Sequence, residues 1–257
     1  MNSSNPVFRN SALGRGGIAS SQNDLENLYN SPSATNVQMR RLTMDDVVMR
    51  TGLLFAILVA SAAVAWILNL SSGFMMIGLF VGLGLALYNS FARKVNPITV
   101  MAYAVAEGIF LGVTSHVYNT VYQGVVAQAI LVTAVTFFSI LVLYTSKKVR
   151  VTPKMYRVAM ISLFTYFGIG IVSWIFSLTG FGHGYGFYGV RGLSLLLATF
   201  GVALAAFFIL LDFDQAQKAI DAGAMENEAW RIGFGLMVTI IWLYLQVLQL
   251  LSSLRDR

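Results

Sequence analysis

One acidic residue, Glu107, stands alone in a long apolar stretch of the sequence. Residues 95–146 contain no other Asp, Glu, Lys or Arg. A carboxylate inside a bilayer is costly unless it is paired, protonated or hydrated, and such residues commonly mark ion or proton pathways. Glu107 is therefore a candidate ligand for a cation or a carrier of a proton. The alternative is a neutral side chain with a structural hydrogen bond.

Two further acids, Asp212 and Asp214, lie in the segment FILLDFDQAQKAID. On a helix, residues two apart point about 200° away from each other, so these two cannot share a face. Asp214 can pair with Lys218 four residues later and is expected to face water. Asp212 shares a face with Ala205 and is expected to point into the bundle. Two solvated acids at the membrane surface are the alternative.

The last apolar segment carries a polar stripe. Its members are Thr239, Trp242, Gln246, Gln249 and Ser253. Their alternating spacings of three and four residues place them on one face of a helix. Lipid does not select such a face, so we expect it to contact protein or a water-filled path. Hydrogen bonding between helices is the alternative interpretation.

The elements that must position these residues are membrane-spanning helices. The chain has 257 residues, of which 57% are hydrophobic and only 11% charged, whereas soluble domains carry about 25% charged residues. About 20 apolar residues cross a bilayer. The runs without charged residues, apart from Glu107 and Arg191, are residues 51–92, 95–146, 158–211 and 232–254. The turn-forming stretches NLSSG, YNTVYQG and GFGHGYGFYG divide the first three runs, which predicts seven helices and an all-α integral membrane protein.

The first 45 residues differ in composition from the rest. They are rich in Asn and Ser, lack the apolar core of a signal peptide and have too few apolar residues to fold alone. We expect residues 1–45 to form a disordered cytoplasmic tail and residues 46–257 to form the transmembrane domain. Within the sequence TMDD at this boundary, Thr43 can cap the first helix.

The basic residues predict the orientation. If the N-terminus lies inside, all Lys and Arg except Arg191, Arg255 and Arg257 fall on the cytoplasmic side, as the positive-inside rule requires. The net charge of +6 therefore reflects membrane topology and does not indicate a nucleic-acid partner. We expect a multi-pass protein of the plasma membrane with a cytoplasmic N-terminus.

Several enzyme and receptor classes do not fit the sequence. The chain has no cysteine, which excludes thiolate chemistry. It also lacks the HExxH pattern of metalloproteases. The last helix has no lysine for a retinal-type Schiff base. We therefore expect neither an enzyme nor a resident cofactor.

The ordered combination of motifs resembles a known family. The acid in NPITVMAYAVAEGIFLG, the segment LLDFDQAQ at the end of the sixth helix and WLYLQVLQLL in the seventh are similar to the Bax inhibitor-1 (transmembrane Bax inhibitor motif) family, in particular to its bacterial branch. The resemblance covers residues 45–254. It implies seven helices with the last at the centre of the other six, a pH-sensitive latch of two acids on the cytosolic side, and a calcium leak.

The resemblance transfers only in part to individual residues. The acid of helix six corresponds to Asp212, and the acid of helix seven falls on Gln246 by letter match. Gln246 lies 15 residues past Arg231, roughly 22 Å along the helix, so Thr239 is nearer to Asp212 in depth. Neither is an acid, so the like-charge pair that would share a proton is missing, and we expect weak pH dependence. A latch arginine falls on Arg93 by position.

The sequence thus predicts a passive cation leak. Calcium is the expected ion because hard cations prefer carboxylate and carbonyl oxygen. Glu107 would be the mid-membrane ligand and Asp212 the ligand at the cytoplasmic mouth, both binding calcium transiently. Asp214, Thr239 and Gln246 complete the predicted pathway. The expected partners are the lipid bilayer and permeant calcium or protons, and protein partners are not predicted.

Two other classes stay open at this point. One is a proton-coupled secondary transporter in which Glu107 cycles its proton. The other is a non-conducting membrane scaffold or stress regulator whose tail recruits partners.

Overall fold

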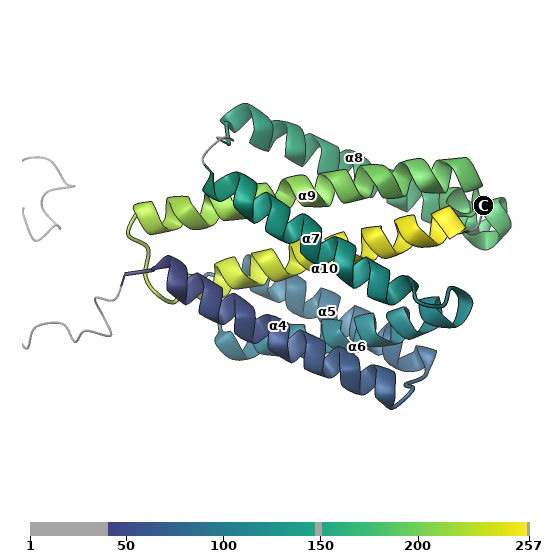
Figure 1. Cartoon of the computed structure of the whole chain (residues 1–257), viewed down its shortest axis with the longest axis horizontal. Helices are drawn as coiled ribbons and strands as arrows, with labels where there is room; N and C mark the ends of the chain where they lie inside the picture. Colours follow the sequence, from purple (N-terminus) through teal and green to yellow (C-terminus); the bar gives the residue numbers. More distant parts are fainter. Residues whose placement is uncertain (1–40, 147–150, 256–257) are drawn as a thin grey trace, which may run out of the picture. The chain divides into compact units, whose positions relative to one another are not determined.

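The computed structural model describes residues 41–146 and 151–255 of the chain. Seven helices in this part of the chain are long and apolar enough to cross a membrane. In chain order they are α4 (Met44–Ile67), α5 (Ser72–Phe91), α6 (Pro97–Val121), α7 (Val125–Thr145), α8 (Pro153–Leu178), α9 (Arg191–Asp221) and α10 (Glu228–Arg255) (Figure 1). Two short 3₁₀ helices, η1 (Phe181–Gly184) and η2 (Gly186–Gly189), connect α8 to α9. The all-α membrane class and the seven spans are confirmed.

The first helix begins with a capping box. The Thr43 hydroxyl accepts a hydrogen bond from the backbone N–H of Asp46, whose carboxylate accepts one from the backbone N–H of Thr43 at 3.1 Å. These reciprocal bonds satisfy donors that the start of a helix leaves free. Leu42 is buried, and its N–H donates to the Ala224 carbonyl at 2.8 Å. The folded unit therefore includes residues 41–45, which were expected to belong to the tail. Residues 1–40 of that tail lie outside the described residues.

Proline and side-chain caps start two further spans. Asn96 caps α6 and Thr152 caps α8, each followed directly by a proline, which is preorganised for the first position of a helix. At the other extreme, α9 has 31 residues and is about 46 Å long, longer than the ~30 Å hydrocarbon core of a bilayer. It continues through both Asp212 and Asp214, so the two acids lie on different faces of one helix.

Glycines let α6 approach its neighbours closely. A Cβ atom added to Gly108 would lie 2.5 Å from the Leu58 carbonyl oxygen of α4. One added to Gly78 of α5 would lie 2.9 Å from the Ala106 carbonyl oxygen of α6. Both positions must therefore be glycine for the backbones to come this near, the usual role of small residues in membrane helix packing.

The last helix is the most buried of the seven spans found in the described part of the chain. It packs against α4, α6, α7 and α9, and Met237, Leu243 and Leu248 on it are completely covered. Figure 1 shows that α4 begins at the end of the bundle opposite to the C-terminus. That α10 is surrounded by all six other helices stays a prediction.

Candidate functional site

The carboxyl group of Asp212 lies inside the bundle, against α10. It is nine residues before the end of α9 at Asp221, about 14 Å along the helix. The Thr239 hydroxyl of α10 interacts with this carboxyl group and also donates to the Gly235 carbonyl at 3.1 Å. The Asp212 Oδ2 atom is buried without a hydrogen-bond partner. The structure thus places Asp212 beside Thr239, the residue that its depth along α10 indicated. One carboxylate oxygen of Asp212 is left available to a ligand.

Asp214 has a different environment although it is only two residues away. Its carboxylate forms an ion pair with Lys218 at 2.5 Å, as the spacing of four residues predicts. Only 16% of its side chain is exposed, less than expected for a group facing water. Tyr144 of α7 lies close enough for its hydroxyl to sense the charge of Asp214, so α7 covers this side of α9. Asp214 is therefore satisfied by a salt bridge, whereas Asp212 is not.

Glu107 lies half-buried on α6 and faces α5. A hydrogen bond links its carboxyl group to the Tyr103 side chain, one turn earlier on the same helix. A Cβ atom added to Gly82 of α5 would lie 2.7 Å from Glu107 Oε1. The glycine therefore leaves the space that the carboxyl group occupies. Tyr103 itself packs edge to face against Phe234 of α10, with ring centroids 5.1 Å apart.

The two intramembrane acids are separate. Among the described residues, no hydrogen bond or charge interaction joins Glu107 to Asp212. No group of three His, Asp or Glu side chains in the described part of the chain could hold a metal ion. A cation at either position would therefore have to complete its coordination with hydroxyl, carbonyl or water oxygens.

The C-terminal half of the α10 stripe forms hydrogen bonds to other helices. The Tyr166 hydroxyl of α8 donates to Gln246 Oε1 at 2.8 Å and lies 3.2 Å from the Tyr188 hydroxyl of η2. Trp242 packs against the rings of Tyr166 and of Phe208 on α9. Gln246, a predicted pathway residue, is thus a link between α10 and α8.

The next turn of the stripe repeats this pattern. The Tyr118 hydroxyl of α6 donates to Gln249 Oε1 at 2.8 Å. The Gln249 amide donates to the Ser194 hydroxyl of α9 at 3.3 Å, and Ser194 and Ser253 are hydrogen-bonded at 2.8 Å. These contacts tie α10 to α6 and α9, as expected from inter-helix hydrogen bonding.

The predicted latch residue Arg93 contacts α10 through its backbone. Its carbonyl oxygen and that of Ala92 each accept a 3.0 Å hydrogen bond from the Arg231 guanidinium. The Arg93 side chain is exposed, and no ion pair within the described residues includes it. A latch role for its side chain stays a prediction.

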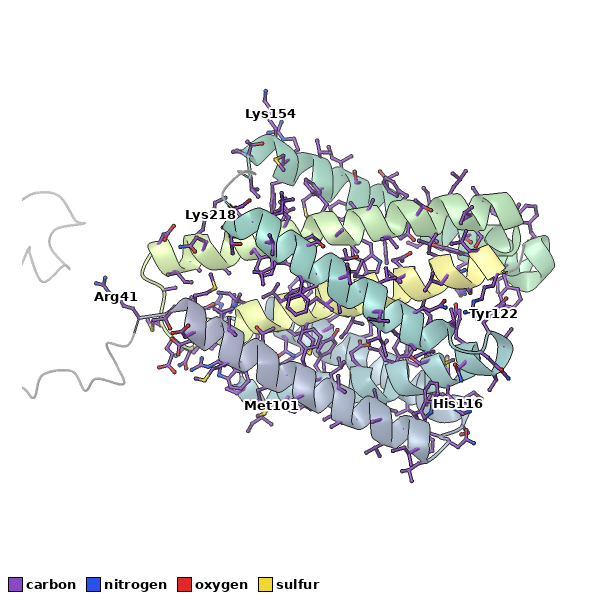
Figure 2. All side chains as sticks on the ribbon, in the orientation of Figure 1. Arg41, Met101, His116, Tyr122, Lys154 and Lys218 are labelled. Atoms are coloured by element: carbon purple, nitrogen blue, oxygen red, sulfur yellow. The ribbon has the colours of Figure 1, made fainter. Side chains whose placement is uncertain are left out.

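Three basic residues lie at one end of the bundle. Figure 2 shows Arg41, Lys154 and Lys218 at the end where α9 terminates, and His116 and Tyr122 toward the opposite end. This distribution follows the alternation of spans that the sequence predicts.

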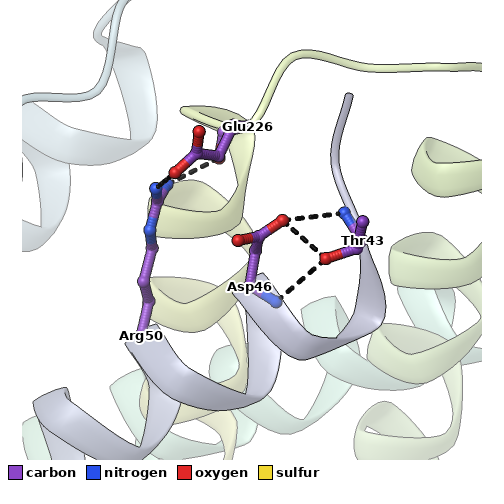
Figure 3. A network of polar contacts seen from close by, with 4 residues as sticks. All are labelled: Thr43, Asp46, Arg50 and Glu226. Atoms are coloured by element: carbon purple, nitrogen blue, oxygen red, sulfur yellow. Dashed lines mark hydrogen bonds and ion pairs between the residues drawn. The ribbon is translucent and has the colours of Figure 1, made fainter. Parts of the chain in front are cut away.

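A polar network holds the start of α4 against the turn between α9 and α10. Arg50 forms an ion pair with the Glu226 carboxylate and donates to the Glu226 carbonyl oxygen at 2.6 Å. Its guanidinium also lies 5.3 Å from the ring centre of Trp230. Figure 3 shows this pair beside the capping box of Thr43 and Asp46. The network fixes the turn from which α9 and α10 carry Asp212 and Thr239 into the bundle.

Sequence reasoning missed several of these residues. Tyr103 could have been found, because it precedes Glu107 by four residues and so lies on the same helix face. Arg50 and Glu226 could not, because they are far apart in the chain and only the fold places them together. The same is true of Tyr166 and Gln246.

The fold and these buried acids define a multi-pass membrane protein whose helical bundle carries carboxyl groups at bilayer depth. A model of the family described as Bax inhibitor 1 like matches residues 5–256 of the sequence. The chain therefore belongs to the Bax inhibitor 1 like family. The matched region begins within the predicted tail and so extends further toward the N-terminus than the resemblance seen in the motifs. No curated protein matches this sequence.

Proposed function

We propose that this protein passively conducts cations across the plasma membrane of a bacterial cell, with calcium as the favoured ion and without enzymatic activity. The observation that carries the proposal is the buried Asp212 Oδ2 atom, which has no hydrogen-bond partner. A buried acceptor without a partner costs free energy, and a bound cation relieves that cost. Carboxylate oxygen suits calcium, and the Thr239 hydroxyl supplies a second oxygen nearby.

Glu107 is the second proposed ion-binding position along the path. It lies ten residues after the first residue of α6, about 15 Å along the helix. The ties of Gln246 and Gln249 to α6, α8 and α9 lie beyond Thr239 along α10. We assign these ties the role of a closed outer gate, which must open before an ion leaves the bundle.

Proton-coupled transport is a second candidate, and a specific contact favours it. The hydrogen bond between Tyr103 and Glu107 joins a carboxyl group to a phenol at bilayer depth. Such a pair can take up and release a proton without a second charged partner. In that case Glu107 carries a proton and calcium movement depends on it.

Calcium flux into vesicles that contain the purified full chain tests the leak directly. We expect flux above that of protein-free vesicles, and we expect Asp212→Asn to lower it about tenfold, the equivalent of about 1.4 kcal/mol of lost ion stabilisation. Asp214→Asn is the matched control, because Asp214 is on the same helix but already paired with Lys218. Equal flux in both variants would show that Asp212 is not a ligand, and no flux in the wild type would favour the scaffold.

Glu107→Gln separates the leak from the transporter when calcium and proton fluxes are measured together. For a leak with Glu107 as a ligand, calcium flux falls strongly and proton movement is not linked to it. For a transporter, the variant abolishes proton movement together with calcium movement in one direction. Unchanged calcium and proton fluxes would show that Glu107 has only a packing role.

The proposed orientation places the N-terminus in the cytoplasm. Single cysteines can be introduced at Ser146, at the end of α7, and at Tyr185, between α8 and α9, because the chain has no cysteine of its own. An impermeant thiol reagent applied to intact cells should label the Tyr185→Cys variant and spare Ser146→Cys. The reverse pattern would overturn the orientation.

A further inference from the structure

An apolar groove runs along the bundle between α4 and α7. It has a volume of about 560 Å³, within the range of small-molecule sites. One wall is the α4 segment from Phe55 to Trp66, and α7 forms the other. The floor includes Ile240 and Ile241 of α10 and Leu111 of α6.

The groove opens onto the surface that faces the bilayer. Val59 on its α4 wall and Ile130 and Phe138 on its α7 wall are each more than half exposed. In helices that span a membrane these side chains contact lipid. The groove is therefore continuous with the lipid-facing surface, and the molecules available to fill it are the hydrocarbon chains of the bilayer.

The dimensions and chemistry of the groove match one such chain. From Phe55 to Trp66 the wall is about 16 Å long, which is about half of the ~30 Å hydrocarbon core and so the depth of one leaflet. Two hydroxyl groups in the lining, of Ser115 and Tyr244, are hydrogen-bonded to each other at 2.7 Å. They therefore need no partner from a ligand.

We propose that the groove between α4 and α7 binds a single acyl chain of a bilayer lipid, in the leaflet on the side of the α4–α5 and α6–α7 connections. The bound chain replaces protein contacts that α4 and α7 lack along this length. It also touches α10 directly at Ile240 and Ile241, the two residues after Thr239. The bound acyl chain would thereby pack against the face of α10 opposite to the hydrogen-bonded residues Gln246 and Gln249. This inference does not depend on which ion the protein moves.

Photolabelling in vesicles tests the proposal. The full chain is reconstituted in phosphatidylcholine that contains a small fraction of phosphatidylcholine with a photoreactive diazirine in one acyl chain, and adducts are located by mass spectrometry. We expect adducts on Ile240 and Ile241, which are only 8% and 6% exposed and are reached by lipid through the groove. Adducts confined to outward residues such as Val135, which is 62% exposed, would overturn the proposal.

Two neighbouring positions on α7 provide a matched pair of variants. Ala134 lines the groove and Val135 does not. Ala134→Trp should fill the groove and lower labelling of Ile240 and Ile241 about tenfold, as for a loss of about 1.4 kcal/mol in occupancy, whereas Val135→Trp should leave it unchanged. If Ala134→Trp does not fold, Ala63→Trp fills the groove from the α4 wall. Equal labelling in filled and control variants contradicts an acyl chain in the groove.

One lining residue distinguishes an acyl chain from a polar ligand. The Thr133 hydroxyl is buried without a hydrogen-bond partner. An acyl chain has no group to bond to it, so Thr133→Val should keep or increase labelling of the α10 residues. Loss of that labelling would show that the groove selects a ligand with a polar atom, and would overturn the proposal.

Discussion

The N-terminal and C-terminal halves of α10, here called inner and outer after the proposed orientation, carry the same polar stripe but surround it with different contacts. In the outer half, Gln246 and Gln249 accept hydrogen bonds from Tyr166 and Tyr118, which lie on two other helices. In the inner half, Thr239 faces Asp212, and one carboxylate oxygen of this acid has no hydrogen-bond partner. Polar groups that the protein satisfies hold helices together, whereas a polar group left unsatisfied inside a membrane is available to a ligand.

The difference also indicates where change is tolerated. The outer ties are neutral, so losing one removes a modest interaction, which for membrane helices averages about 0.6 kcal/mol. The inner site contains the Asp212 carboxyl group, which can carry a charge within an apolar bundle. Changing the charged groups around it should therefore cost more free energy than losing a neutral hydrogen bond.

The largest effect is expected when a second acid is placed beside Asp212. In Thr239→Asp two carboxyl groups would share one site, and they cannot both ionise easily, so one keeps its proton until the pH rises. We expect calcium flux to become pH-dependent, changing about tenfold between about pH 6 and pH 8, in vesicle assays at stepped pH.

Gln246→Glu is the control for this prediction. Gln246 lies two turns further along α10 and contacts Tyr166 rather than Asp212, so the added acid should produce a much weaker pH response. A wild-type protein that is already steeply pH-dependent, and loses that dependence in Asp212→Asn, would show that Asp212 has another titrating partner.

A smaller effect is expected at the outer gate. Tyr166→Phe removes the hydroxyl that donates to Gln246 and leaves the half-buried amide oxygen of Gln246 without this hydrogen bond. We expect the free energy of unfolding to fall by about 0.5–1.5 kcal/mol. If this tie closes the path, basal calcium flux should rise as the melting temperature falls.

Tyr156→Phe on the same helix is the matched control for Tyr166→Phe, because the Tyr156 side chain is exposed. If Tyr166→Phe lowers stability but leaves calcium flux unchanged, the hydrogen bond between Tyr166 and Gln246 has only a structural role.

The smallest effect is expected for Ser194→Ala. The Ser194 hydroxyl contacts Ser253 and Gln249, but Gln249 keeps its hydrogen bond from Tyr118. We expect a stability loss near or below about 0.6 kcal/mol and no change in calcium flux. A large increase in flux would show that Ser194, and not Tyr166, controls the outer half.

Much of the architecture follows from local features of the sequence. Charge-free runs of sufficient length define the spans, and the capping signals at Thr43, Asn96 and Thr152 define where three of them begin. The pairing of Asp214 with Lys218 follows from a spacing of four residues. Each of these features depends on neighbours within one or two helical turns, so the order of residues is enough to predict it.

The partners of the candidate site residues depend on the tertiary structure. The sequence indicates that Glu107 lies within a membrane span and that Asp212 points into the bundle. It does not show that Glu107 faces a glycine of α5 and Asp212 a threonine of α10. It also shows a polar face on α10 without showing which half is satisfied. Hydrogen bonds such as Tyr166 to Gln246 and ion pairs such as Arg50 to Glu226 join residues far apart in the chain. Only the packing of helices against one another decides such contacts, because periodicity determines the face of a helix and not the element that covers it.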